Sequence, residues 1–281
     1  MAGPPTVLVT GADGQVGRAL RPLLPTARYA TREQLDVTDR AGVHEAVAGA
    51  DVVVHLAAIT DVDRCEREPS LAEQVNGAGS HNVADAARAA GARVIGVSTD
   101  YVFDGTAPGE YSEADQPRPL SVYGRTKLAG EQALLEAAGS TVIRTSWVYG
   151  DGRNFIRTIL RAALSGRALA VVDDQVGRPT AADDVARAIV HLLSVDPPLL
   201  VHVTGDGPPT TWAGLAEHSL AVAGLTVPVE HVSTVEYGRR VDSVLAPRPS
   251  NSLLSLDRAR GLGVPLSDWR TSVSAYARGA A

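Results

Sequence analysis

The stretch VLVTGADGQVGRAL, residues 7–20, decides the fold, because it joins an apolar strand to a helical segment through a glycine-rich turn. Gly11, Gly14 and Gly17 stand in that turn. Glycines there allow a tight turn and a close approach of the backbone to a pyrophosphate, while the helix N-terminus meets the negative charge. The stretch therefore predicts a dinucleotide-binding turn at the start of an α/β fold.

Strand-length apolar runs alternate with helical patterns through the first two thirds of the chain. The apolar runs occupy 51–57, 93–99 and 141–146, and helix-like segments occupy 70–91 and 122–139. Such alternation indicates βαβ units, whose right-handed crossovers build a parallel sheet covered by helices on both faces. We predict the α/β class, with a Rossmann-type doubly wound parallel sheet and a smaller, irregular C-terminal substrate lobe.

The alternation of strands and helices ends in the C-terminal half. There, loops rich in proline and glycine separate single helices at 154–165 and 211–223. We predict a dinucleotide-binding Rossmann core over 1–150 and a mainly substrate-binding lobe over 151–281. Later segments such as 171–205 are expected to return to the core, because the last of them ends in the strand-like VHVTG.

Composition excludes several classes of function. The net charge is −6 and no basic cluster is present, so nucleic acid is not expected as a partner. Cys65 is the single cysteine, which rules out a disulfide framework within the chain and a cysteine zinc site. No stretch approaches the roughly 18 apolar residues of a membrane span, and the first apolar run is expected to be a strand and not a signal peptide. We therefore expect a cytoplasmic protein with no membrane partner.

Lys127 is the only lysine in a chain whose other 25 of 26 basic residues are arginines. Tyr123 precedes it by four residues in a helical pattern, so both side chains lie on one face, one turn apart. An ammonium near a phenol stabilises the phenolate and lowers its pKa from about 10. We expect Tyr123 to give a proton to a carbonyl oxygen that receives a hydride. Lysine suits the partner's role because its compact charge also binds ribose hydroxyls, whereas guanidinium is a wide planar fork.

Thr99 is the third candidate catalytic residue, because it ends the apolar run 93–99. Doubly wound folds place their active sites at the carboxyl edge of the sheet. A threonine hydroxyl there can donate a second hydrogen bond to a substrate carbonyl. Thr99, Tyr123 and Lys127 together predict a carbonyl reductase.

Arg32 predicts the cofactor. About twenty residues after the first glycine, where an acidic residue would bind a ribose 2′-hydroxyl, the chain has Thr31 and Arg32. An arginine at that place pairs with a 2′-phosphate. We therefore predict NADPH, with NADH as the alternative.

Taken together, the motifs resemble those of the extended short-chain dehydrogenases/reductases and, within them, the dTDP-4-dehydrorhamnose reductase family. The glycine spacing G-x-x-G-x-x-G is the one that short-chain dehydrogenases/reductases carry. From residue 7 to about 254, the matching motifs follow the family's order: TGADGQVG, AAITDVDRCEREP followed by VNG, STDYVFDG, VYGRTKLAGE, RTSWVYG, NFIRTIL, DDQVGRPT and RPSNSLL.

The resemblance implies an NADPH-dependent oxidoreductase that reduces the C4 ketone of a dTDP-linked 4-keto-6-deoxyhexose, a step of dTDP-L-rhamnose synthesis. It makes Tyr123 the proton donor, Lys127 its partner and ribose ligand, and Thr99 the hydrogen-bond donor to the carbonyl. The other cofactor residues that it implies are Gly11, Asp13, Gly14, Gln15, Val16, Gly17, Arg32, Asp36, Val37, Leu56, Ala57, Ala58 and Thr60. The sugar-nucleotide residues that it implies are Val62, Asp63, Asp100, Tyr101, Trp147, Arg178, Arg248 and Asn251.

Metal binding and assembly stay open. Some members of the family bind magnesium through acidic residues at a dimer interface, but this chain has no matching glutamate cluster. We therefore assign no metal residue, and both magnesium and a homodimer remain open.

Three other functions are compatible with parts of the pattern. A 4-ketoreductase for an antibiotic dTDP-deoxysugar shares all the motifs. A non-catalytic NADP-binding regulatory subunit, such as that of methionine adenosyltransferase, would tolerate loss of the three catalytic residues, which are all present. A nucleotide-sugar dehydratase needs a Thr-Asp-Glu arrangement, and Tyr101 stands where its glutamate would be. Plain reduction is therefore favoured over dehydration.

Three further residues are expected to be structural. His55 lies within an apolar strand, so we expect a core position and not a general base. Trp212 and Trp269 are expected to pack the smaller lobe.

Overall fold

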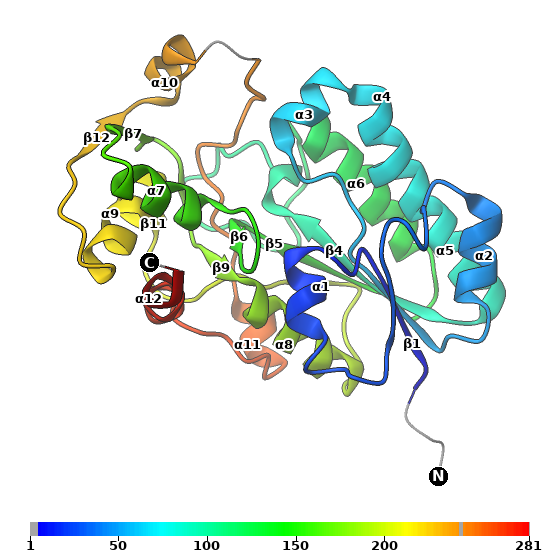
Figure 1. The fold of residues 1–281 in the computed structure, drawn as a ribbon. Helices are drawn as coiled ribbons and strands as arrows, with labels where there is room; N and C mark the ends of the chain where they lie inside the picture. The colour runs from blue at the N-terminus through cyan, green and yellow to red at the C-terminus, as the bar shows by residue number, and fades with distance from the viewer. Residues whose placement is uncertain (1–4, 242–243, 281) are drawn as a thin grey trace.

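A six-stranded sheet forms the centre of the chain (Figure 1). The computed structural model describes residues 5–241 and 244–280. The strand order is β10-β5-β4-β3-β1-β2, and all neighbouring strands are parallel, which confirms the predicted Rossmann-type sheet. Its strands are β1 (Val7–Thr10), β2 (Arg28–Ala30), β3 (Val52–His55), β4 (Arg93–Thr99), β5 (Thr141–Thr145) and β10 (Leu200–His202).

Helices cover both faces of this sheet, because the central strands are apolar on both sides. All four residues of β1 and of β3 are buried. One apolar core lies between the sheet and α1 (Gln15–Leu20), α8 (Ala182–Leu193) and α11 (Asp257–Gly261). The other lies between the sheet and α2 (Arg40–Val47), α5 (Gly79–Ala90) and α6 (Val122–Leu135). The strand order reverses between β1 and β3, the position at which doubly wound folds bind their ligands.

The helical segment predicted over 70–91 contains a π-helical turn. It is built from α4 (Pro69–Ala72), the π-helix η1 (Glu73–Ala78) and α5, and it follows the short helix α3 (Val62–Arg67). Buried Asn76 in η1 bonds to both backbone groups of Ile59, accepting from the amide at 2.8 Å and donating to the carbonyl at 3.1 Å. Its amide also donates to Thr126 Oγ1 of α6 at 3.2 Å. Asn76 therefore ties the loop after β3 to helix α6.

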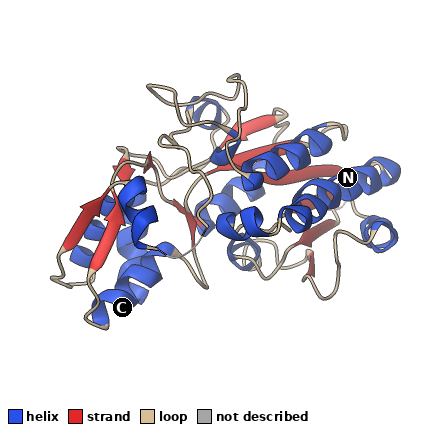
Figure 2. Cartoon of the chain, turned by 90° about the horizontal axis from the view of Figure 1, so that it is seen from above, coloured by secondary structure: helices blue, strands red, loops and turns tan. Residues whose placement is uncertain are grey.

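A smaller lobe, seen on the left of Figure 2, lies beside the main sheet. Its sheets have two strands each: β7 (Leu169–Val172) with β12 (Val229–Val232), β8 (Val176–Gly177) with β11 (Thr210–Thr211), and β6 (Val148–Tyr149) with β9 (Thr180–Ala181). The helices α7 (Phe155–Leu164), α9 (Trp212–Val222) and α12 (Trp269–Ala280) share one apolar core with β6, β7, β9 and β12. The remaining elements are the 3₁₀-helix η2 (Asp100–Val102) and α10 (Thr234–Arg240).

The segment 171–205 divides between the two parts. Helix α8 packs against α1, and β10 forms the edge of the main sheet beside β5. By contrast, β7 and β8 pair with β12 and β11 of the smaller lobe. The proposed domain boundary near residue 150 stays a prediction.

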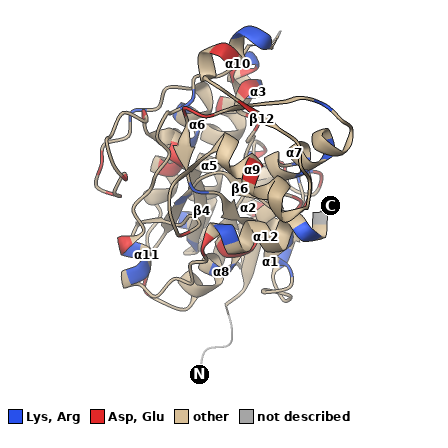
Figure 3. Cartoon of the chain, turned by 90° about the vertical axis from the view of Figure 1, so that its left-hand side faces the viewer, with Lys and Arg blue, Asp and Glu red and all other residues tan. Residues whose placement is uncertain are grey.

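Figure 3 shows Lys and Arg interspersed with Asp and Glu along the elements that face the viewer. Among the helices of the described chain, none has the length and apolar character needed to cross a membrane.

Candidate active site

A cavity of about 600 Å³ opens at the carboxyl ends of β1, β3, β4 and β5. It is lined by every residue that the sequence assigned to the cofactor: Gly11, Asp13, Gly14, Gln15, Val16, Gly17, Arg32, Asp36, Val37, Leu56, Ala57, Ala58, Thr60, Tyr123 and Lys127. The glycine turn and the catalytic residues therefore border one cavity.

Gly11 allows the turn after β1 to pack directly against the segment after β3. Its φ of +66° lies in the left-handed region. A Cβ atom at this position would lie 2.6 Å from the backbone nitrogen of Ala57. Only glycine fits both the conformation and the contact.

The start of helix α6 places Tyr123 close to Thr99. The Ser121 side chain accepts from the Gly124 amide at 3.0 Å and caps the helix. A Cβ atom on Gly124 would lie 2.2 Å from the carbonyl oxygen of Tyr101, so glycine lets the first turn of α6 contact η2. Tyr123 and Thr99 are both buried, and the Thr99 hydroxyl lies near the Tyr123 hydroxyl.

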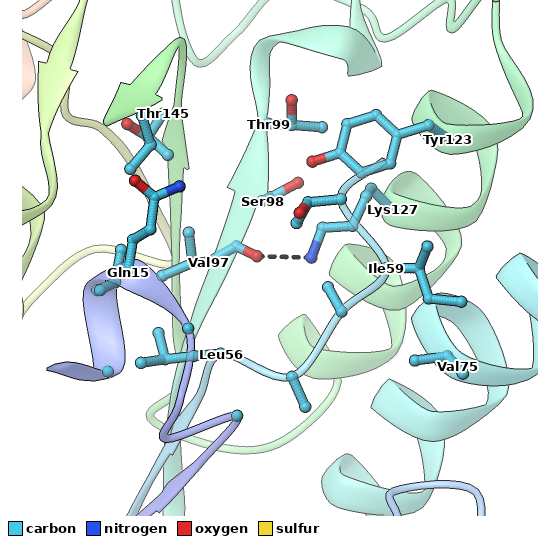
Figure 4. Close-up of a pocket in the computed structure, with 18 of the residues that line it drawn as sticks. Gln15, Leu56, Ile59, Val75, Val97, Ser98, Thr99, Tyr123, Lys127 and Thr145 are labelled. Atoms are coloured by element: carbon cyan, nitrogen blue, oxygen red, sulfur yellow. Dashed lines mark hydrogen bonds between the residues drawn. The ribbon is translucent and has the colours of Figure 1, made fainter. Parts of the chain in front are cut away.

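Lys127 lies one turn further along α6 and is 8 % exposed. Its Nζ donates to the carbonyl oxygen of Val97 at 2.7 Å, the contact drawn in Figure 4. Burial lowers the pKa of Lys127 to about 8, and Glu131 on the next turn opposes this shift. The ammonium therefore remains mostly charged at neutral pH.

The expected lowering of the Tyr123 pKa is absent from this structure. Burial raises the pKa of Tyr123 above its usual value, and the nearby Thr99 hydroxyl offsets this only in part. Burial is the larger effect, and the Lys127 ammonium, which donates to the Val97 carbonyl, does not cancel it. Tyr123 therefore carries its proton at neutral pH, as a proton donor must before the reaction.

His55 is confirmed as a core residue. It is buried at the end of β3, where Nδ1 lies 2.9 Å from Thr10 Oγ1 and Nε2 lies 3.0 Å from Ser80 Oγ. Burial, followed by the charge of Lys127, lowers the pKa of His55 to about 3. The imidazole is therefore neutral.

Two polar side chains that sequence analysis missed, Ser98 and Thr145, also line the cavity. Ser98 Oγ and Thr145 Oγ1 are buried without a hydrogen-bond partner in the described chain. The same holds for Oε1 of Gln15, which the sequence already assigned to the cofactor. Figure 4 shows Ser98 and Thr145 at the ends of adjacent strands, facing Gln15 and Lys127. Buried polar atoms of this kind normally have partners, so the cavity fits a ligand with several polar groups. Apart from adjacency to Thr99, the sequence holds no signal for Ser98 or Thr145.

Arg32 and Asp36 border the cavity after β2. Thr38 bonds to Asp36 through its backbone amide and its hydroxyl, and these bonds, with a smaller effect of Arg32, lower the Asp36 pKa. Because the Asp36 carboxylate bonds to Thr38, the Arg32 guanidinium can bind an anion such as a ribose phosphate.

The residues assigned to the sugar nucleotide divide into two groups. Val62, Asp100, Tyr101 and Trp147 line the cavity. Asp63 and Arg248 form an ion pair at 2.9 Å whose arginine also bonds to the Tyr101 hydroxyl. This pair therefore lies next to the cavity, on the far side of Tyr101.

Arg178 and Asn251 are not brought to the cavity. The Arg178 guanidinium is buried and bonds to Glu110, to the carbonyl oxygen of Gly207 at 2.9 Å and to that of Leu254 at 3.2 Å. Asn251 donates to the carbonyl oxygens of Ala107 and Gly109 at 2.9 and 2.7 Å. Their hydrogen-bonding groups hold loops together and neither residue lines the cavity, so their contact with the nucleotide stays a prediction.

Trp212 packs against the core of the smaller lobe, as predicted, and it also lines the cavity. Its ring stacks on Trp147 with centroids 3.8 Å apart. Trp147 has a φ of 48°, a strained value for a non-glycine residue, and its other side contacts Gly177, where a Cβ atom would lie 2.7 Å from the indole. Trp269 is buried in the smaller lobe, as predicted.

Arg153 and Asn154 line the cavity from the loop before α7. Asp151 in this loop pairs with Arg18 of α1 at 3.2 Å, which holds the loop beside the glycine turn. The Arg153 guanidinium has neither an acidic nor a hydrogen-bond partner among residues 5–241 and 244–280.

Metal coordination has no candidate among the described residues, since no group of three or more His, Cys, Asp or Glu side chains is placed to hold an ion.

A doubly wound sheet with a glycine turn and a Tyr-Lys pair on one cavity defines the extended short-chain dehydrogenases/reductases. Within that class, the chain belongs to the family described as the RmlD substrate binding domain, whose family model matches residues 5–280. The resemblance seen in the motifs is confirmed.

Relatives cover almost the whole chain. A dTDP-4-dehydrorhamnose reductase of Sinorhizobium fredii is 39% identical over 283 residues, 94% of each chain. The spore coat polysaccharide biosynthesis protein SpsK of Bacillus subtilis is 37% identical over 278 residues, 96% of each.

Solved structures agree closely with this fold. A dTDP-4-dehydrorhamnose reductase of Clostridium acetobutylicum has a TM-score of 0.91 at 33% identity, covering 96% of this chain and 98% of that one. The Bacillus anthracis dTDP-4-dehydrorhamnose reductase, solved in complex with NADP, has a TM-score of 0.90 at 32% identity and covers 98% of both chains.

Proposed function

We propose that this protein is an NADPH-dependent reductase of the C4 ketone of a dTDP-4-keto-6-deoxyhexose, of the dTDP-4-dehydrorhamnose reductase type. The observation that carries the proposal is that Thr99, Tyr123 and Lys127 border the same cavity as the glycine turn. Relatives that carry the reductase's name match at least 94% of this chain, which supports the substrate class.

The residues of the cavity fit NADPH. The glycine turn would hold the pyrophosphate, Arg32 the 2′-phosphate and Lys127 the ribose hydroxyls. Gln15, Ser98 and Thr145 offer buried polar atoms that lack partners within the described chain, where a polar ligand such as the cofactor's carboxamide would be satisfied. When bound, NADPH supplies the hydride.

The chain's own residues then handle the proton. Tyr123, whose pKa burial raises, gives its proton to the ketone oxygen as the carbonyl becomes an alcohol. Lys127, charged and one helical turn away, stabilises the phenolate that is left. Thr99 contributes a second hydrogen bond to the same oxygen. We expect the reaction to take place in the cytoplasm, where the buried Cys65 stays reduced.

The test is NADPH oxidation by the purified protein with the L-lyxo rhamnose precursor beside its 2-deoxy and 2,6-dideoxy analogues, with the C4 configuration of each product identified. Turnover of the precursor to dTDP-L-rhamnose supports the proposal. Turnover of the deoxygenated analogues alone would make the protein a 4-ketoreductase of antibiotic deoxysugars. Binding of NADPH with no turnover of any sugar would favour a non-catalytic regulatory subunit.

A further inference from the structure

Thr99 has one hydroxyl proton, and in this structure that proton is already used. Its Oγ1 donates to Asp100 Oδ1 at 3.0 Å and accepts from the Tyr101 amide at 3.2 Å. Because a hydroxyl has a single donor, Thr99 has no proton for a ketone oxygen while the Asp100 carboxylate accepts it.

The surroundings of Asp100 disfavour its ionised form. The residue is 2 % exposed, and its Oδ2 has no well-aligned hydrogen-bond partner in the described chain. No arginine, lysine or histidine within the described ranges forms an ion pair with it. A carboxylate buried without a cation is costly, whereas the neutral acid is not.

The titratable and charged groups near Asp100 come from three elements. Tyr101 follows it in η2, and Tyr123 and Lys127 face this region from α6. Beyond Tyr101 lies the ion pair of Arg248 and Asp63, whose two charges offset each other. The Ser252 hydroxyl, from the loop that follows Arg248, stabilises the carboxylate, but burial is the larger effect and raises the Asp100 pKa to about 6.

We propose that Asp100 is a positioning residue: in its protonated form it donates to the Thr99 oxygen and so turns the Thr99 proton towards the ketone. This rests on the proposed reductase function. Asp100 keeps its proton throughout, because the proton that the ketone oxygen acquires comes from Tyr123 and Thr99 contributes only a hydrogen bond. Asp100 thus decides whether Thr99 can assist Tyr123.

The consequence is that turnover falls twice on the alkaline side of its pH profile. The fall at lower pH, the lower limb, belongs to Asp100. Activity is full below the Asp100 pKa and falls above it to a lower plateau, the activity of Thr99→Val, because only the protonated acid orients Thr99 while Tyr123 still donates its proton. Ligands that fill the cavity displace water and raise this pKa above its value of about 6 in the free protein. Lys127 gives a separate, higher limb, because it must stay charged and burial lowers its pKa to about 8.

The deciding variant is Asp100→Asn. A carboxamide keeps the size of the acid and donates through Nδ2 at every pH, so it imitates the protonated residue. We expect Asp100→Asn to lose the lower limb and keep the higher one, with KM for the sugar nucleotide within about twofold of the parent. An unchanged lower limb would overturn the proposal, and so would a large rise in KM with an unchanged profile, which would make Asp100 a substrate ligand.

A double-mutant cycle separates positioning from a structural role. In Thr99→Val, Asp100 has no hydroxyl to direct, so kcat of Thr99→Val and of Thr99→Val/Asp100→Asn should be equal. A further loss in the double variant would contradict the proposal. Thermal unfolding and the Kd for NADPH show that each variant is folded and binds its cofactor.

One measurement distinguishes this proposal from the reductase function itself. Should the parent protein turn over no keto sugar, infrared titration of the NADPH-bound protein still tests Asp100. A protonated carboxyl band that titrates above pH 6 and is missing from Asp100→Asn supports the protonated state. Absence of that band from the parent protein overturns it.

Discussion

Lys127 is the residue whose identity the chemistry restricts most. Lys127 is buried and its Nζ donates to the Val97 carbonyl at 2.7 Å, a contact made by a compact ammonium, whereas a guanidinium is a wider planar group. We expect Lys127→Arg to fold and to lose at least about 100-fold in kcat at neutral pH, the typical scale of lost acid–base assistance. The measurement is steady-state NADPH oxidation.

Arg125→Lys, on the same helix, is the matched control. Arg125 is exposed and donates to the carbonyl oxygen of Leu120 at 3.1 Å, so its replacement should leave turnover unchanged. Near-normal activity in Lys127→Arg would show that the single lysine is not required.

Arg32 carries the cofactor preference. We expect Arg32→Ala to reduce kcat/KM with NADPH by roughly 10- to 100-fold, the scale of one or two charge-assisted bonds to a phosphate, and to leave NADH unaffected. Parallel kinetics with both cofactors check this. If the parent protein has equal kcat/KM values with NADH and NADPH, Arg32 does not recognise the 2′-phosphate.

Sequence reasoning succeeds for residues whose role depends on local spacing. Gly11, Tyr123 and Lys127 can be assigned because a turn or one helical face fixes their geometry. It is weaker where segments far apart in the chain meet, because no local pattern shows that Trp212 also lines the cavity or that Arg178 holds loops together.

Among the elements, β6, β8 and α9 meet at the Trp147–Trp212 stack. Trp147 keeps its left-handed backbone because Gly177 and Trp212 enclose its ring. We expect Trp212→Ala to lower the free energy of unfolding by about 1–3 kcal/mol, from the lost stack and the exposed neighbour. It should also raise KM for the sugar nucleotide, while NADPH affinity, set by the main sheet, stays the same.

Urea unfolding and KM measurements test this prediction, with Trp212→Phe as the conservative control that keeps an aromatic surface. A Trp212→Ala protein with unchanged KM would show that the stack is packing alone. The elements themselves were predictable, since runs such as 93–99 coincide with β4; the two-stranded sheets were not, because two to four residues leave no periodic pattern.

For the whole molecule, two buried histidines make stability depend on pH. Burial lowers the pKa of His55 and of His202 to about 3, and neither ring nitrogen of His202 has a partner in the described chain. The unfolded chain has histidine pKa values near 6.5, so it binds more protons than the folded chain between these values. Stability should therefore fall as the pH drops from about 6.5 to about 3.

His202→Leu isolates one of these contributions. We expect its free energy of unfolding to change less steeply across that window, by up to about 1.4 kcal/mol per pH unit. Denaturant unfolding at several pH values measures the slope, and the exposed His81→Leu serves as control. Equal slopes for the parent and His202→Leu would mean that His202 is not kept neutral.

A single lysine also makes the chain a natural target for selective covalent labelling. Because Lys127 is the only side-chain amine and burial lowers its pKa to about 8, an acylating reagent small enough to enter the cavity would modify the side chains at one place. A bound dinucleotide would shield that amine, so the extent of labelling would count vacant active centres directly, one per chain. The same scarcity means that coupling this protein to a support through lysine would proceed only by occupying its own catalytic cavity.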